Sequence, residues 1–173
     1  GKGYFRNNLQ LIASLSRYKV NAITDRPEDH IMAYAAAFSS LQNKYNIYGN
    51  DLKNYIRIFV ALSELPLQAN VKDDYVLNSH LYQLFWFLNN KDAAAQYQFT
   101  AFNIDLEEIF GANLKVLSSS HIYMHDDEIS NGQQSYKVIS SATFSSPDYA
   151  PAIWDPTTCN YSSRNGSQIT AVT

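Results

Sequence analysis

The fold is decided by the stretch DYVLNSHLYQLFWFLN, residues 74–89. Its apolar residues recur every three or four positions, a spacing that places them along one face of an α-helix. These residues are Leu77, Leu81, Leu84, Phe85 and Leu88, and the stripe is widened by Tyr82 and Trp86. We therefore expect a central helix, around which a mainly helical fold assembles.

Helical spacing continues on both sides of this stretch. The expected helices cover residues 5–18, 28–46 and 51–64, and a short one starts at Asp105, with another possible turn at 91–99. Pro27 suits a first helical turn, and the Asp105 carboxylate has the spacing of an N-cap. In the helix at 28–46 the side chains expected to face inward are Ile31, Tyr34, Ala35, Phe38, Leu41 and Tyr45. The prediction is a lysozyme-like or irregular bundle of five to six short helices.

Composition changes near residue 117. Ser, Asn, Thr, Pro and Gly dominate afterwards, and the periodicity fades. We expect a helical domain at 1–117, an extended linker at 118–168 and a β-strand at 169–173, whose β-branched residues have no evident partner strand nearby. That terminal strand is interpreted as the start of a truncated second domain.

Charge and composition exclude several classes of function. The net charge is −3 and basic residues never cluster beyond a pair, so a surface that tracks nucleic-acid phosphates is not expected. No apolar run reaches the roughly 18–20 residues that a membrane span needs. Cys159 is the only cysteine, and no histidine lies close to it in the sequence, so we expect it to be inert.

The densest polar cluster is a candidate metal site. His121 and His125 are four residues apart, which on a helix would let both bind one zinc ion, with Asp127 as a carboxylate ligand. The alternative is a solvated hinge, because the segment has no apolar stripe. That alternative is the favoured interpretation.

Glu64 is the candidate acid for cleavage of a glycosidic bond. Such an acid needs a cleft that raises its pKa, usually with a second carboxylate nearby. Glu64 stands at the end of an expected helix, before Leu65 and Pro66, and has no evident capping role. A surface position is the competing interpretation.

The tail of the chain carries a resemblance to a known family. Residues 149–156 read YAPAIWDP, residues 159–164 read CNYSSR, and residues 169–173 read ITAVT. Together they resemble the entry to a zinc-dependent N-acetylmuramoyl-L-alanine amidase domain of the type 2 family. The family would place an Ile-His pair after Thr173, and that His is its first zinc ligand, so no zinc ligand maps onto this sequence.

The resemblance implies hydrolysis of the amide between N-acetylmuramic acid and the L-alanine of the stem peptide. Zinc, expected in the missing amidase domain and not in this chain, would activate a water and polarise the carbonyl. Tyr4, Trp154 and Tyr161 are then assigned to substrate binding or to an interface with that domain.

The upstream residues are similar to helical regions that precede some secreted members of this family. The blocks that carry this similarity are ALSELP (61–66), LYQLFWFLN (81–89) and IDLEEIFGANLKVLS (104–118). Residues 1–65 are also weakly similar to the later half of a lysozyme-like transglycosylase domain, with 24–42 as its long central helix. The catalytic Glu of that fold would lie before Gly1.

These observations predict the non-catalytic helical part of a secreted or envelope peptidoglycan hydrolase. The parent enzyme would be the amidase, and this chain alone would be inactive. Its expected partners are peptidoglycan and its own C-terminal domain. There are two alternatives. One is a lysozyme-like glycosidase that uses Glu64, and the other is a module that binds peptidoglycan or a partner protein.

Overall fold

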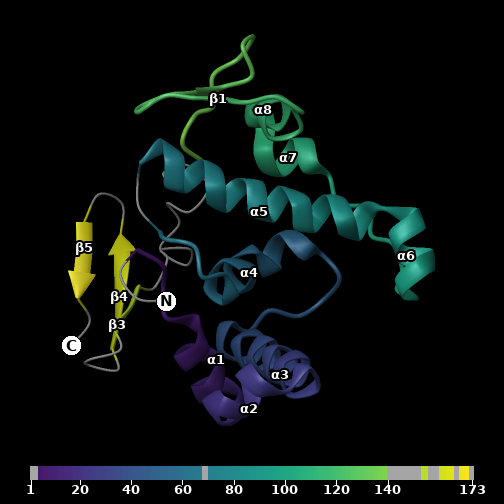
Figure 1. The fold of residues 1–173 in the computed structure, drawn as a ribbon, viewed down its shortest axis with the longest axis vertical. Coiled ribbons are helices and arrows are strands. Elements are labelled where there is room, and N and C mark those ends of the chain that lie inside the picture. Colours follow the sequence, from purple (N-terminus) through teal and green to yellow (C-terminus); the bar gives the residue numbers. More distant parts are fainter. Residues whose placement is uncertain (1–3, 68–69, 140–152, 156–159, 166–167, 172–173) are drawn as a thin grey trace. The chain divides into compact units, whose positions relative to one another are not determined.

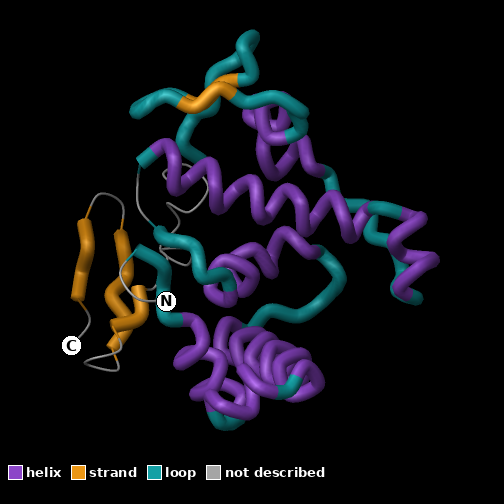
Figure 2. The backbone as a smooth tube through the Cα atoms, viewed as in Figure 1, coloured by secondary structure: helices purple, strands orange, loops and turns teal. Residues whose placement is uncertain are grey.

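The computed structural model describes residues 4–67, 70–139, 153–155, 160–165 and 168–171. Helices dominate the described residues and strands follow near the C-terminus, which confirms the predicted mainly α fold with a terminal strand (Figures 1 and 2). The chain divides into two compact units. The first contains Gly1–Pro66 and Trp154–Asn160, and the second contains Leu67–Ile153 and Tyr161–Thr173. The predicted helical domain at 1–117 therefore spans parts of both units.

The described helices of the first unit come in close succession. They are α1 (Asn8–Ser16), α2 (Val20–Asp25), α3 (Pro27–Tyr45), the 3-10 helix η1 (Leu52–Tyr55) and α4 (Ile56–Leu62). The helix expected at 5–18 is shorter, because Arg17 turns into the left-handed conformation with a φ of 63° and ends α1. The short α2 then follows as a separate helix.

The first unit is packed through small residues on α3. Ala33 and Ala37 are fully buried and form one core cluster with Ile12 of α1 and Ile23 of α2. Their small side chains let α1 approach α3 closely, and the Ser40 hydroxyl donates to the carbonyl of Leu15 across this contact. The buried face of α3 therefore includes Ala33 and Ala37, which the predicted stripe left out, beside the predicted Leu41.

Ile31 shows where that prediction is wrong. It was expected to face inward, yet it is 68% exposed, and Ala35 is exposed as well. Leu41, from the same predicted stripe, is buried as expected. A prediction from apolar residues spaced three or four positions apart favours large side chains. The close approach of α1 instead buries the small alanines of α3.

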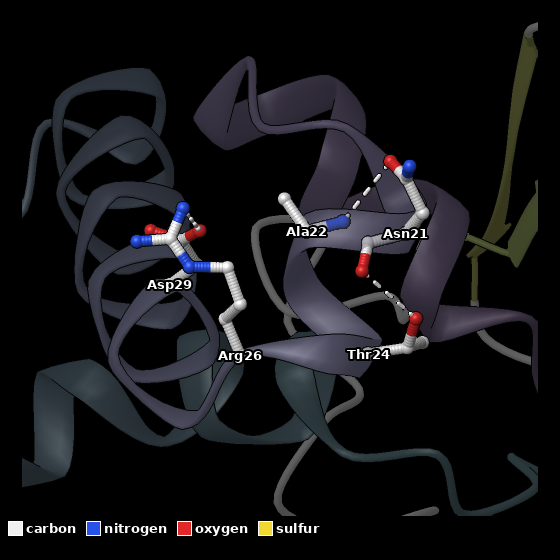
Figure 3. A network of polar contacts seen from close by, with 5 residues as sticks. All are labelled: Asn21, Ala22, Thr24, Arg26 and Asp29. Carbon is white, nitrogen blue, oxygen red and sulfur yellow. Dashed lines mark hydrogen bonds and ion pairs between the residues drawn. The ribbon is translucent and has the colours of Figure 1, made fainter.

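Local polar contacts fix the corner between α2 and α3 (Figure 3). The Thr24 hydroxyl donates to the carbonyl of Asn21 at 3.1 Å, and the Asn21 side chain accepts the amide of Ala22 at 3.0 Å. Arg26 forms an ion pair with Asp29, one helical turn later, at 3.2 Å. All of these contacts are local and solvent-accessible, so we assign them to the turn and not to a site.

The second unit is built around the helix that the sequence singled out. Its described helices are α5 (Val71–Asn89), α6 (Lys91–Tyr97), α7 (Leu106–Phe110), the 3-10 helix η2 (Gly111–Asn113) and α8 (Leu114–Leu117). Leu77, Leu81 and Phe85 of α5 are buried, as predicted, whereas Trp86, which was expected to widen the same stripe, is 48% exposed. Phe85 and Tyr82 contact the ring of Phe110 in α7. Figure 1 shows α7 and α8 beside α5, and α6 following its C-terminal end.

Residues 118–139 are folded where an extended linker was expected. Strands β1 (Tyr123–Met124) and β2 (Ile129–Ser130) pair antiparallel, and Ile129, Tyr136 and Ile139 are buried. The Tyr136 hydroxyl and the amide of Ile139 both donate to one carboxylate oxygen of Asp74, each at 2.8 Å. This carboxylate at the start of α5 binds a segment more than 60 residues away, a contact that no local pattern encodes.

Three further strands lie near the C-terminus. They are β3 (Ile153–Asp155), β4 (Asn160–Asn165) and β5 (Gln168–Ala171), which form one sheet in the order β3-β4-β5. A strand was predicted at 169–173, and β5 occupies most of that range. The expectation that it has no partner strand nearby is wrong, because β5 pairs antiparallel with β4, with Asn165 opposite Gln168.

Candidate functional site

Glu64 lies just beyond the C-terminal end of α4 and is exposed. Its backbone carbonyl accepts the amide of Arg6 at 2.9 Å, so the main chain at this position is held by the N-terminal segment. Its carboxylate has no second carboxylate partner among the described contacts. The residue therefore lacks the apolar enclosure and the paired acid that glycoside hydrolysis requires.

Arg6 organises the end of α4. Its guanidinium donates to the carbonyls of Val60, Ser63 and Leu65 and to the Ser63 hydroxyl, with 2.7 Å to Leu65 and 2.9 Å to the hydroxyl. The side chain of Asn8 donates to the Ser63 carbonyl as well, at 2.5 Å. The guanidinium thus satisfies carbonyls that the end of a helix leaves without partners.

Burial lowers the pKa of Arg6 to about 10. The group therefore remains charged at neutral pH, and its positive charge complements the negative end of the α4 dipole. Its hydrogen bonds are directed into the protein, which is the arrangement of a structural cap. We assign Arg6 to stability and not to chemistry.

The Glu64 carboxylate interacts electrostatically with Tyr34. Burial raises the pKa of Tyr34, and the Glu64 carboxylate raises it further. The ring of Tyr34 stacks on that of His30 with 4.8 Å between centroids, and His30 contacts the carbonyl of Ile23 at 3.3 Å. This group combines a neutral phenol, an imidazole and an exposed carboxylate. These side chains can form hydrogen bonds to a ligand, but none of them is an activated nucleophile.

The histidine pair does not have the geometry expected of a zinc site. His121 and His125 lie in non-helical chain on either side of β1, so helical i, i+4 spacing does not bring them together. His121 contacts the Ser120 hydroxyl at 2.9 Å, and Asp127 is exposed in a bend. Within the described residues, no three His, Cys, Asp or Glu side chains gather closely enough to hold a metal ion.

The remaining predicted residues are placed only in part. Tyr4 is exposed and contacts Phe5 edge to face, with 5.4 Å between centroids. Trp154 lies in β3 and Tyr161 in β4, and only their strand assignment is described. Cys159 lies outside the described residues.

An aromatic cluster in the second unit was not predicted from the sequence. The ring of Phe87, near the end of α5, lies 5.7 Å from that of Tyr97 in α6 and 5.6 Å from that of Phe99. We call these three residues the Phe87 cluster. Phe87 is 38% exposed and Tyr97 is 62% exposed, so the cluster presents ring surface to solvent instead of closing into the core.

The chain around this cluster is tightly held. Asn89 donates to the carbonyl of Ile104 and accepts its amide, each at 2.8 Å, as a neighbouring strand would. The Asn90 side chain caps α6, and the amide of Phe102 donates to the carbonyl of Leu88 at 3.0 Å. These bonds fix the loop after α6 against the end of α5. The rings therefore need little ordering to receive a ligand.

The sequence does contain a signal for the cluster. Within residues 93–104 there is no charged residue, and aromatic side chains alternate with neutral amides and a threonine. Helical periodicity assigns such rings to a core, so the exposed arrangement emerges only once α6 and its loop are folded.

Comparison with known proteins adds no family to this description. No protein-family model, no curated protein and no solved structure matches the chain. Among the described helices, none combines the length and apolar character needed to cross a membrane.

Proposed function

We propose that this chain is the non-catalytic helical and linker part of a secreted zinc-dependent N-acetylmuramoyl-L-alanine amidase, and that it binds peptidoglycan. The observation that carries the proposal is the motif of residues 149–164, YAPAIWDP followed by CNYSSR, which resembles the entry to that amidase domain. The pairing of β5 with β4 removes the unpaired-strand argument. The proposal therefore rests on the motif and not on the strand.

The described residues offer no zinc site, and no hydrolytic step is assigned to them. In the family, the bound zinc activates the attacking water. The residues of this chain contribute binding instead. The exposed rings of the second unit support that role, because aromatic faces with polar surroundings are suited to sugars, which have apolar faces and hydroxyl edges.

The proposal is tested by an amide-cleavage assay on purified peptidoglycan and on a synthetic muramoyl peptide. The 173-residue chain should release no new amino groups. A version extended beyond Thr173 through the amidase domain should release them, and a zinc chelator should abolish that activity. Amide cleavage by the 173-residue chain itself, or an inactive extended version, would contradict the proposal.

The exposed position of Glu64 favours this proposal over the glycosidase alternative. A glycosidase would release reducing sugar ends from the same peptidoglycan samples. We expect none from the 173-residue chain. Release that is lost in Glu64→Gln would establish the alternative instead.

A further inference from the structure

We infer that the Phe87 cluster is a binding site for a neutral N-acetylated oligosaccharide, with a sugar face stacked on the rings of Tyr97 and Phe87. The inference rests on the proposed function, because it names the part of peptidoglycan that the chain contacts and the residues that contact it. The glycan strand is the ligand, and not the stem peptide.

The shape and exposure of the cluster give the first argument. The rings of Tyr97 and Phe99 lie 5.7 and 5.6 Å from that of Phe87, and Tyr97 is 62% exposed. The interplanar angles of 52° and 34° show that neither ring stacks flat on that of Phe87. Exposed aromatic surface of this kind can pack against the apolar face of a pyranose ring.

The polar surroundings give the second argument. Gln96, Gln98 and Asn103 are exposed close to the rings in the sequence, and Thr100 lies between them. A carboxamide supplies donors and an acceptor together, which matches the hydroxyl and acetamido groups of a sugar. Residues 93–104 contain no charge, so the segment that carries Tyr97 and Phe99 offers no ion-pair partner to the charged groups of a stem peptide.

The rigidity of the loop gives the third argument. The two bonds between Asn89 and Ile104, together with the cap of α6 by Asn90, hold the backbone that carries the rings in place before any ligand arrives. Gln98 adopts the left-handed conformation, with a φ of 58°, and turns the chain so that the amide of Phe99 donates to the carbonyl of Ala94. A preformed site loses less conformational entropy on binding than a mobile one.

The experiment is a calorimetric titration of the full chain with the β-1,4-linked tetramer of N-acetylglucosamine. Trp86 stands next to Phe87 and is exposed, so its fluorescence gives a second readout. Loss of one stacked ring should weaken binding about tenfold in Tyr97→Ala. Tyr97→Phe keeps the ring and should bind within about twofold of the parent chain, by the same reasoning.

Tyr48 provides the matched control. It is also 62% exposed but belongs to the first unit, so Tyr48→Ala should bind the tetramer with unchanged affinity. Phe87→Ala removes the central ring and should abolish binding; because it could also disturb α5, circular dichroism must show an intact helix. Tyr97→Ala, at an exposed position, keeps the test decisive if Phe87→Ala does not fold.

Two outcomes overturn the inference. One is that the parent chain does not bind the tetramer, as expected if the surface contacts a protein instead. The other is that Tyr97→Ala binds as tightly as the parent chain. Sedimentation with insoluble peptidoglycan separates these results from the proposed function: equal sedimentation of both proteins rejects the cluster as the site while leaving peptidoglycan binding in place.

Discussion

Replacing Tyr136 by Phe tests how the second unit is closed. Tyr136 is only 4% exposed, and its hydroxyl donates to the buried Asp74 carboxylate at 2.8 Å. A hydrogen bond to a charged group contributes about 1.5–3 kcal/mol, so at pH 7 the variant should be less stable by about 2 kcal/mol. Phe fills nearly the same volume, and therefore the loss measures the hydroxyl and not a cavity.

The pH dependence of this difference makes the prediction sharper. Burial raises the pKa of Tyr136, and the Asp74 carboxylate raises it further, well above the ordinary value of 10.0. Above pH 10 the unfolded chain has lost a proton that the folded chain keeps, so the contribution of Tyr136 is fully present below that pH and declines above it. The decline is about 1.4 kcal/mol per pH unit, which brings parent chain and variant to equal stability at about pH 11.5.

The measurement is urea unfolding between pH 7 and pH 11, followed by the fluorescence of Trp86 in α5 in a Trp154→Phe background. Tyr123→Phe is the control, because Tyr123 is exposed in the same unit and its replacement should leave the stability unchanged at every pH. A difference between Tyr136→Phe and the parent chain that stays constant up to pH 11 would refute the reasoning. So would a variant as stable as the parent at pH 7.

Other contacts lead to predictions of the same kind. Arg6→Met should destabilise the first unit by about 3 kcal/mol in urea unfolding, because the end of α4 loses a charged cap, whereas Lys19→Met at an exposed position should have no effect. Asn89→Ala removes two hydrogen bonds to Ile104 and should lower the free energy of unfolding by about 2 kcal/mol, with faster hydrogen exchange in the loop after α6. Unchanged exchange would contradict the conclusion that these bonds fix the loop. Glu64→Gln should change neither stability beyond about 0.5 kcal/mol nor peptidoglycan binding, and a loss of binding would reassign the site to Tyr34 and Glu64.

Local sequence patterns predicted the elements better than their packing. The spacing of Leu77, Leu81 and Phe85 identified α5 and its buried face, and Asp105 caps α7 as its position indicated. These features depend on residues within one or two helical turns. The inward face assigned to Ile31 was wrong, because a partner helix selected the alanine face of the same helix.

Long-range contacts account for what sequence patterns could not show. The segment around Tyr136 was expected to be a linker, since it has no periodicity, yet the Asp74 carboxylate holds it in the second unit. The Phe87 cluster brings together a ring near the end of α5 and two rings from ten and twelve residues later, and their exposure depends on the loop that Asn89 fixes. His121 and His125 matched a metal-binding spacing that only a helix would realise, and the chain there is not helical.

The most direct test of the central claim is sedimentation of the 173-residue chain with intact peptidoglycan and, in parallel, with insoluble chitin, a neutral β-1,4-linked polymer of N-acetylglucosamine that carries no stem peptides. The account predicts that the chain sediments with chitin as it does with intact peptidoglycan, and that Tyr97→Ala stays largely in the supernatant. A chain that remains soluble with both materials would contradict peptidoglycan binding, and one that sediments with peptidoglycan but not with chitin would contradict recognition of the neutral glycan.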